Sequence, residues 1–326
     1  METDPDYYVA GVRAGNRKIL AKTITLIESA LPAHQELTAL VMEGLLPYTG
    51  KSVRLGITGV PGVGKSTFIE SLGMLLTSRG HRVAILAVDP SSARSGGSIL
   101  GDKTRMEKLS VEENAFIRPS PTGGTLGGVS RKTRESMLAC EAAGYDVIII
   151  ETVGVGQSET SVASMVDFFL LLILAGAGDE LQGIKRGIVE LADAIAVNKA
   201  DNDNIEKAMV AKKAYENALH LFAPSDTGWT PQVFTCSAIQ TAGIEEIWGV
   251  VCKYCEAMTE SGALGRKRQE QALEWMGQLL EEGLKDWFYQ MPRIRHMLPE
   301  LTNAVVKGTI TPTTAVKKML DAINVN

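Results

Sequence analysis

Residues 59–66, with the sequence GVPGVGKS, carry the clearest chemical pattern in the chain. They fit G-x-x-x-x-G-K-[ST], in which glycines let backbone N–H groups converge on phosphate oxygens, aided by the dipole of the following helix. In this pattern Lys65 brings a positive charge to the β- and γ-phosphates, and the Ser66 hydroxyl can ligate Mg²⁺. The pattern predicts a nucleoside triphosphate site, the P-loop, formed by Gly59, Val60, Pro61, Gly62, Val63, Gly64, Lys65, Ser66 and Thr67.

A second pattern, Asn198-Lys199-Ala-Asp201, predicts which base the nucleotide carries. The Asp201 carboxylate can accept hydrogen bonds from the N1–H and the exocyclic amine of guanine. Adenine offers no such pair of donors, so a desolvated carboxylate would be left unpaired. Asn198 and Lys199 are expected to brace this loop and cover the ring. Further along, Ser237, Ala238 and Ile239 fit the loop whose backbone N–H groups meet the guanine oxygen.

Three carboxylates are candidates for the metal and γ-phosphate chemistry. Glu151 ends an apolar run and is followed three residues later by Gly154, whose N–H can sense the γ-phosphate. Asp89 ends another apolar run, and Asp102 lies shortly after it; the alternative role of each is a helix cap or a turn. The predicted catalytic residues are Lys65, Asp89, Asp102 and Glu151. The predicted magnesium ligands are Ser66, Asp89, Asp102 and Glu151.

The residue that activates water is not evident from the sequence. Gln157 is a candidate because a glutamine orients the attacking water in many GTPases, but it follows Gly154 by three residues rather than one. No arginine finger is evident, although Lys185 or Arg186 could supply a cation when a partner docks. These features predict slow intrinsic hydrolysis that a partner accelerates.

The elements that must position these residues alternate along the middle of the chain. Short apolar, β-branched runs predict strands at residues 53–58, 82–88, 115–118, 145–150, 168–174, 194–197 and 232–235. Helical patterns separate most of them, so we expect an α/β fold with a mostly parallel sheet covered by helices on both faces. Ligands of such sheets bind at the carboxyl ends of the strands, where the motifs above fall.

Three regions are predicted from these patterns. Residues 1–50 form an N-terminal helical extension, and residues 51–257 form the nucleotide-binding domain. Residues 258–326 form a C-terminal helical arm that packs on the core or on a second copy of the chain, because its apolar face would otherwise be exposed.

Composition narrows the classes of partner. The 326 residues carry a net charge of −5, so no global basic field predicts binding to nucleic acid or to an anionic membrane. No apolar run reaches the length of a membrane span, and the acidic start does not resemble a signal peptide, which predicts a soluble cytoplasmic protein. Cys252 and Cys255 form a CxxC pair with helical spacing, and we interpret them as buried helix residues rather than a redox or metal site.

The motifs together resemble the SIMIBI class of P-loop GTPases, and most closely its MeaB/ArgK/MMAA branch, the methylmalonyl-CoA mutase accessory GTPases. The resemblance covers essentially the whole chain. Its most specific blocks are Gly96-Gly-Ser-Ile-Leu-Gly-Asp-Lys-Thr-Arg-Met106 and Glu151-Thr-Val-Gly-Val-Gly-Gln157, supported by Asp89-Pro-Ser-Ser, Asp179-Glu-Leu-Gln-Gly-Ile-Lys185 and the two nucleotide motifs.

The resemblance implies a regulatory role. Members bind methylmalonyl-CoA mutase or a related cobalamin-dependent acyl-CoA mutase. They hydrolyse GTP to GDP with the help of Mg²⁺, and this hydrolysis is coupled to the loading of adenosylcobalamin and to protection of the mutase. An adenosyltransferase is a further possible partner, and the arm implies a homodimer. Switch segments are implied at residues 123–128, 157–166 and 179–185, with Gly154, Gln157, Gln182 and Lys185 as switch residues.

Two other classes stay open at this point. A nickel-insertion GTPase of the same class would need His- or Cys-rich metal capture, which the sequence lacks. A P-loop kinase linked to arginine or ornithine transport would use ATP, and the Asn198–Asp201 motif argues against it.

Overall fold

The computed structural model describes residues 3–89, 106–121, 126–152, 158–175, 186–220 and 228–323. The chain forms two compact units, Met1–Gln271 and Ala272–Asn326. Each unit is considered by itself below. Five of the predicted site residues, Asp102, Gly154, Gln157, Gln182 and Lys185, lie outside the described residues, as does the side chain of Asp89.

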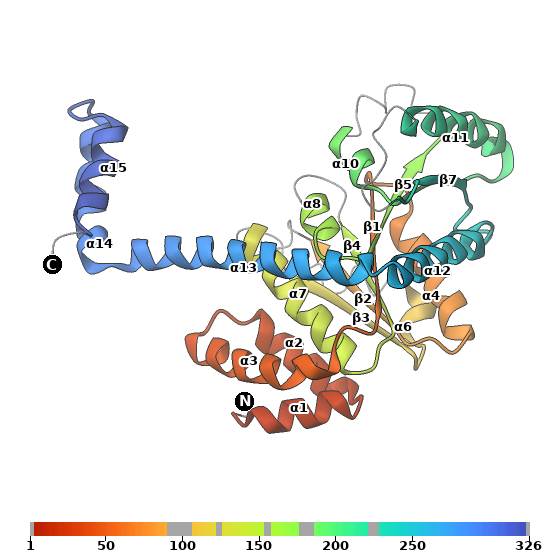
Figure 1. Cartoon of the computed structure of the whole chain (residues 1–326), viewed down its shortest axis with the longest axis horizontal. Coiled ribbons are helices and arrows are strands. Elements are labelled where there is room, and N and C mark those ends of the chain that lie inside the picture. Colours follow the sequence, from red (N-terminus) through yellow and green to blue (C-terminus); the bar gives the residue numbers. More distant parts are fainter. Residues whose placement is uncertain are drawn as a thin grey trace. The chain divides into compact units, whose positions relative to one another are not determined.

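A seven-stranded parallel sheet forms the centre of the first unit, within the described residues (Figure 1). Its strands are β1 (Val53–Gly59), β2 (Val83–Asp89), β3 (Ala115–Pro121), β4 (Val147–Thr152), β5 (Phe168–Leu174), β6 (Ala194–Asn198) and β7 (Gln232–Thr235). The order across the sheet is β3-β2-β4-β1-β5-β6-β7. The α/β class and all seven predicted strands are confirmed, and the P-loop strand β1 lies at the middle of the sheet.

Successive side chains of each strand point to opposite faces of the sheet, so the hydrophobic core is divided into a cluster on each face. In β4, Ile149 packs in one cluster with Phe68 of helix α4 (Lys65–Ser78) and Trp248 of helix α12 (Ile244–Glu260). The neighbouring Ile148 and Ile150 pack in the opposite cluster with α7 (Leu126–Ala142) and the N-terminal helices. Both faces are therefore buried, as near-continuous apolar strands require.

The N-terminal extension consists of α1 (Pro5–Arg13), α2 (Arg17–Glu28), α3 (Pro32–Leu45) and the short 3-10 helix η1 (Leu46–Tyr48). Gly15, with a positive φ of 70°, and Asn16, whose side chain caps α2, separate the first two helices. Apolar side chains of these helices, including Tyr8 and Leu20, are buried in the cluster that contains Ile148.

The remaining helices of this unit connect the strands. They are α6 (Glu107–Ser110), α8 (Ser158–Ala163), α10 (Arg186–Leu191), η3 (Asn202–Asn204), α11 (Ile205–Leu219) and the first residues of α13 (Ala263–Gln290). The connection between α12 and α13 is short, because α12 continues to Glu260 and α13 begins at Ala263. Cys252 and Cys255 lie on α12 as free, half-buried thiols, and burial raises the pKa of Cys255 to about 12.

A buried ion-pair network fastens the start of α13 beside the amino ends of the strands. Arg268 donates two hydrogen bonds to the Asp167 carboxylate, from Nε to Oδ1 at 2.8 Å and from Nη2 to Oδ2 at 2.6 Å. Arg54 of β1 donates its backbone N–H to the same carboxylate and pairs through its guanidinium with Glu141 of α7. Arg268 also donates to the carbonyl of Gly50. We call these five residues the Arg268 network.

Helices joined by short turns make up the described residues of the second unit. It contains the rest of α13, then α14 (Pro292–Val306) and α15 (Pro312–Asp321). Ile294 of α14 and Ala315 of α15 are buried, and Arg293 Nη1 donates to the carbonyl of Ala322 at 3.2 Å. Helix α14 begins at Pro292, because proline suits a first helical position.

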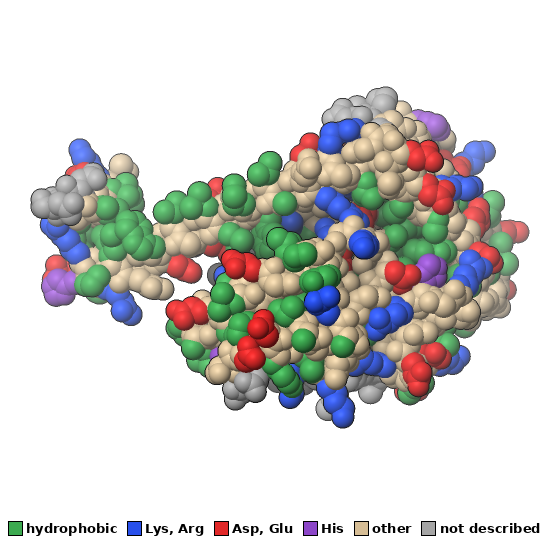
Figure 2. All heavy atoms as spheres, turned by 60° about the horizontal axis from the view of Figure 1, so that its bottom comes forward, with side chains coloured by type: hydrophobic (Ala, Val, Ile, Leu, Met, Phe, Trp, Pro, Cys, Tyr) green, Lys and Arg blue, Asp and Glu red, His purple; other side chains and the backbone are tan. Residues whose placement is uncertain are grey.

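An apolar stripe runs along α13 in the second unit. Its side chains recur every three or four residues and are more than half exposed; they are Leu273, Met276, Leu280, Leu284 and Trp287. Figure 2 shows apolar side chains along this helix. Among the described residues, no helix combines the length and apolar character needed to cross a membrane.

Candidate functional site

Glycines shape the P-loop between β1 and α4. Gly64 has a φ of 94°, and a Cβ there would lie 2.8 Å from Asn198 Nδ2. A Cβ on Gly59 would lie 2.4 Å from the carbonyl oxygen of Leu172 in the adjacent strand β5. Glycine is required at both positions because the backbone passes so close to its neighbours. The loop thereby leads directly into the N-terminus of α4, where backbone N–H groups can receive phosphate oxygens.

Lys65 is the first residue of α4, and only 8% of its surface is exposed. Its Nζ donates to the carbonyl oxygens of Gly59 at 2.7 Å and Val60 at 3.3 Å. The ammonium group is thus held inside the loop that is predicted to surround the phosphates.

Two of the metal-site candidates, Ser66 and Glu151, meet where β4 ends beside the P-loop helix. Ser66 Oγ donates to Glu151 Oε1 at 3.0 Å, and Glu151 is 8% exposed. This contact arises because β1 and β4 pair in parallel, with Ile57 opposite Glu151. Asp89 ends β2, which pairs with the other side of β4. A hydroxyl and a carboxylate side by side are oxygen ligands of the kind that Mg²⁺ prefers, so these residues fit the predicted metal site.

A hydroxyl pair that the sequence analysis missed lies next to this contact. Thr58 Oγ1 and Thr152 Oγ1 are 2.7 Å apart, and both side chains are buried. The pair ties the residue before Gly59 to the residue after Glu151, and so fixes the P-loop relative to the metal-site strand. Its only sequence signal is a threonine next to each motif.

Asn198 joins the P-loop to the base-recognition loops. The side chain is 1% exposed. Its Nδ2 donates to the carbonyl of Val63 at 2.8 Å, and its Oδ1 accepts from the backbone N–H of Ala238 at 3.1 Å. The side chain thus braces two loops that are distant in the sequence.

Asp201 is placed by the loop that follows β7. Ser237 Oγ donates to Asp201 Oδ2, and the same hydroxyl accepts from the backbone N–H of Gln240 at 3.2 Å. Lys199 has a positive φ of 59°, and the backbone N–H of Ala200 donates to the carbonyl of Cys236 at 2.9 Å. The Asp201 carboxylate is therefore oriented before any base arrives, and Lys199 remains exposed beside it.

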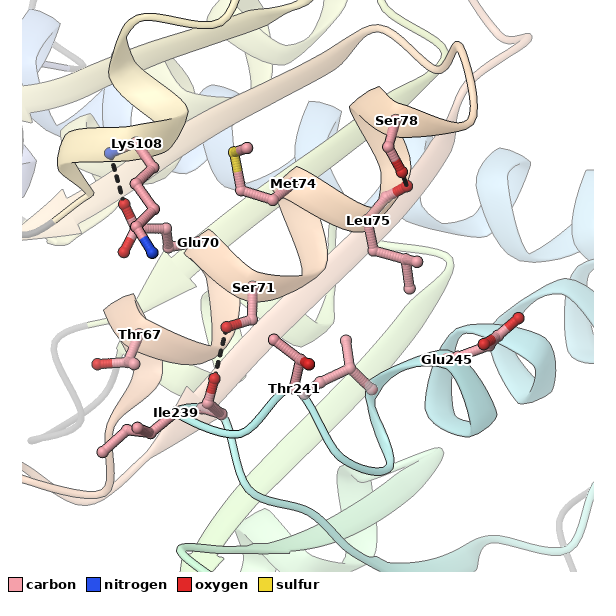
Figure 3. A pocket seen from close by; sticks show the side chains of 12 residues that line it. Thr67, Glu70, Ser71, Met74, Leu75, Ser78, Lys108, Ile239, Thr241 and Glu245 are labelled. Carbon is pink, nitrogen blue, oxygen red and sulfur yellow. Dashed lines mark hydrogen bonds between the residues drawn. The ribbon is translucent and has the colours of Figure 1, made fainter.

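A hollow of about 630 Å³ lies along the outer side of α4 (Figure 3). Its lining includes Thr67 and Ala238, two of the residues predicted to bind the nucleotide. Ser71, a second residue that the sequence analysis missed, donates its hydroxyl to the carbonyl of Ala238 at 2.6 Å. Ser71 lies on the helix that follows the P-loop, and no recognised motif marks it.

Comparison with known proteins assigns this site to a family. A family model described as "Methylmalonyl Co-A mutase-associated GTPase MeaB" matches residues 20–292. The chain belongs to this family. The family match confirms the resemblance drawn from the motifs, and as a member of the methylmalonyl-CoA mutase-associated GTPases the protein is a GTP hydrolase.

Individual relatives agree over nearly the full length. The chain is 48% identical over 312 residues to "GTPase ArgK" of Escherichia coli, covering 96% of this chain and 94% of that one. It is 46% identical over 327 residues to the mouse "Methylmalonic aciduria type A homolog, mitochondrial", covering 97% and 79%. A crystal structure described as "LAO/AO transport system kinase" superposes with a TM-score of 0.79 at 41% identity, covering 100% and 99%.

Proposed function

We propose that this GTPase binds a cobalamin-dependent acyl-CoA mutase, most directly methylmalonyl-CoA mutase, and that GTP binding and hydrolysis gate the loading of adenosylcobalamin and protect or reactivate the mutase. The observation that carries the proposal is the family match over residues 20–292. The contacts of Ser66 with Glu151 and of Asn198 with Val63 support it. The chain lacks the His- or Cys-rich segment of a nickel-insertion GTPase.

Hydrolysis in this proposal is attack of water on the γ-phosphorus of GTP. A P–O bond to the attacking water oxygen forms, the bond to the β-phosphate oxygen breaks, and GDP and phosphate leave. Lys65 and the N–H groups at the start of α4 stabilise the charge on the equatorial oxygens. Ser66, Glu151, Asp89 and Asp102 would hold Mg²⁺, which supplies positive charge to the β- and γ-phosphates when bound.

Guanine recognition is assigned to Asp201, supported by its bond to Ser237. Replacing Asp201 with Asn should shift preference from guanine to xanthine nucleotides, because the amide can donate to the 2-oxo group that replaces the amine. Asp203→Asn is the matched control, since Asp203 is an exposed carboxylate in the neighbouring η3. Equilibrium binding of GTP and XTP to both variants is the measurement. Unchanged GTP preference in Asp201→Asn would refute the assignment.

The link to the mutase has its own experiment. The intact protein is loaded with a non-hydrolysable GTP analogue or with GDP, mixed with purified methylmalonyl-CoA mutase, and co-purified. Nucleotide-dependent capture, together with hydrolysis that the mutase accelerates, would support the proposal. Equal hydrolysis rates with and without the mutase would remove the basis for a partner-controlled switch.

The organisation of the chain supports a further part of the proposal. Residues 1–50 are assigned as the helical extension, 51–257 as the GTPase domain and 258–326 as a dimerisation arm. The exposed stripe from Leu273 to Trp287 supports a homodimer, because a second copy would cover it. A cobalamin adenosyltransferase is a further proposed partner, and the cytoplasm is the proposed location.

A further inference from the structure

Ser71 forms the contact between the P-loop helix and the loop after β7. It lies on α4 and is half-buried, and its hydroxyl donates to the Ala238 carbonyl at 2.6 Å, as Figure 3 shows. The receiving loop is compact: Ser237 and Ala242 exchange two backbone hydrogen bonds of 3.0 and 3.1 Å. Ser71 therefore holds the peptide between Ala238 and Ile239, which belongs to a rigid turn.

The direction of that peptide follows from its planarity. The Ala238 carbonyl and the Ile239 N–H belong to the same trans peptide, so they point in opposite directions. With the carbonyl held toward α4, the Ile239 N–H points away from α4. On the other side of Ala238, its own N–H is bound to Asn198 Oδ1 at 3.1 Å. Both peptides that flank Ala238 are therefore fixed.

Ser71 and Asn198 thus fix the two peptides on either side of Ala238, and with them the direction of the Ile239 N–H. Asn198 also braces the P-loop at Val63, and Ser237 orients Asp201. Asp201 follows β6, and the Ser237 hydroxyl ties its carboxylate to the turn after β7, so the turn and the carboxylate border the same proposed base site. The Ile239 N–H on this turn can donate a hydrogen bond to the 6-oxo group of guanine. It cannot do so to the 6-amino group of adenine, because that group is itself a donor.

We infer that Ser71 is a positioning residue for recognition of the guanine 6-oxo group. It touches no part of the nucleotide itself. It acts through the Ala238 carbonyl, which sets the direction of the Ile239 N–H. The inference rests on the proposed guanine site and adds a residue outside the nucleotide motifs.

The experiment compares two nearly isosteric variants. Ser71→Thr keeps the hydroxyl and Ser71→Val removes it, and both carry a β-branched side chain at the same half-exposed helix position. Ser71→Ala is the smaller companion variant and favours the helix. Ser78→Ala is the matched control, because Ser78 lines the same hollow but donates to Leu75 within α4.

Binding of GTP and 6-thio-GTP is measured for each protein. The thio analogue keeps the N1–H and the amine that Asp201 is proposed to read, and replaces only the 6-oxo oxygen with a weaker acceptor. The wild type, Ser71→Thr and Ser78→Ala should prefer GTP. In Ser71→Val and Ser71→Ala the preference should fall by about 3- to 10-fold, the range of one neutral hydrogen bond.

The outcomes separate the two proposals. If the wild type prefers GTP over ATP but Ser71→Val and Ser71→Ala keep the full preference for GTP over 6-thio-GTP, the role of Ser71 is overturned and the guanine site stands. An equal loss for both nucleotides would also overturn it, since that result indicates only general damage to the site. If the wild type does not discriminate GTP from ATP, both proposals fail together.

Discussion

At the scale of single residues, the site depends on side chains that bridge elements rather than on the motif positions alone. Asn198 is the strongest case, since it contacts Val63 and Ala238 while almost fully buried. A sequence motif identifies Asn198 but not these partners, because they belong to loops far away in the chain.

Replacing Asn198 with Ala should therefore damage both folding and binding. It leaves the Val63 carbonyl and the Ala238 N–H without their partner, and we expect the free energy of unfolding to fall by about 2–3 kcal/mol. Chemical denaturation of the nucleotide-free protein measures this loss. Asn204→Ala is the control, because Asn204 makes one exposed bond to the Lys199 carbonyl and should change stability by less than about 0.5 kcal/mol. Equal losses for both variants would contradict the bracing role.

The contact between Ser66 and Glu151 carries a second prediction at this scale. Glu151→Gln keeps the size of the side chain but removes the charge beside Ser66. We expect hydrolysis to fall by roughly 10²-fold or more and the Mg²⁺ concentration for half-maximal activity to rise. GTP binding measured without magnesium should change little. An unaltered magnesium dependence would remove Glu151 from the metal site.

At the scale of elements, the strands could be predicted almost completely from the sequence. The central strands β1, β4, β5 and β6 are short, largely apolar runs, since both of their faces are buried. Boundaries were harder, because they depend on caps and turns: Gly15 and Asn16 divide α1 from α2, and Pro292 begins α14. The link between β4 and α4 through Ser66 could be expected from strand order, whereas the Ser71 bond could not.

The Arg268 network is the element-scale feature with the clearest energetic consequence. Asp167 is buried and receives two hydrogen bonds from Arg268, so Arg268→Ala would leave a buried carboxylate with much less compensation. We expect a loss of about 3 kcal/mol in unfolding free energy. Arg266→Ala is the control, since Arg266 is exposed and bonds only weakly to the Ser261 carbonyl. Similar denaturation midpoints for the two variants would contradict the prediction.

Asp193, which precedes β6, gives a prediction about pH. Burial raises the pKa of this carboxyl, although Lys267 and the Phe169 N–H oppose the shift. A carboxyl with a raised pKa favours the folded state below its unfolded pKa, and that contribution is lost as the pH rises through the folded pKa. Asp193→Asn should therefore raise the thermal midpoint at neutral pH, and the gain should shrink as the pH falls. A gain that does not change with pH would indicate a different cause.

At the scale of the whole molecule, the apolar stripe on α13 predicts the oligomeric state. Leu280→Arg would place an unpaired charge in the centre of the stripe, so the dimer dissociation constant should rise by about 100-fold or more. Sedimentation equilibrium measures the change. Gln278→Arg is the control, since it adds the same charge about half a turn away, near the opposite side of the helix. A monomeric wild type, or a dimer insensitive to Leu280→Arg, would contradict the prediction.

The Arg268 network also has a consequence for the order in which the chain can mature. Arg268 and Gly50 are 218 positions apart, and Arg268 and Asp167 are 101 apart. Contacts of such separation form late, after the intervening strands have paired. During synthesis, the GTPase sheet must therefore emerge and close before α13 can be fastened. The helical segment beyond Gln271, which carries the stripe, leaves the ribosome after the GTPase sheet. A nascent chain would thus complete its nucleotide site before it presents the surface proposed to join two copies.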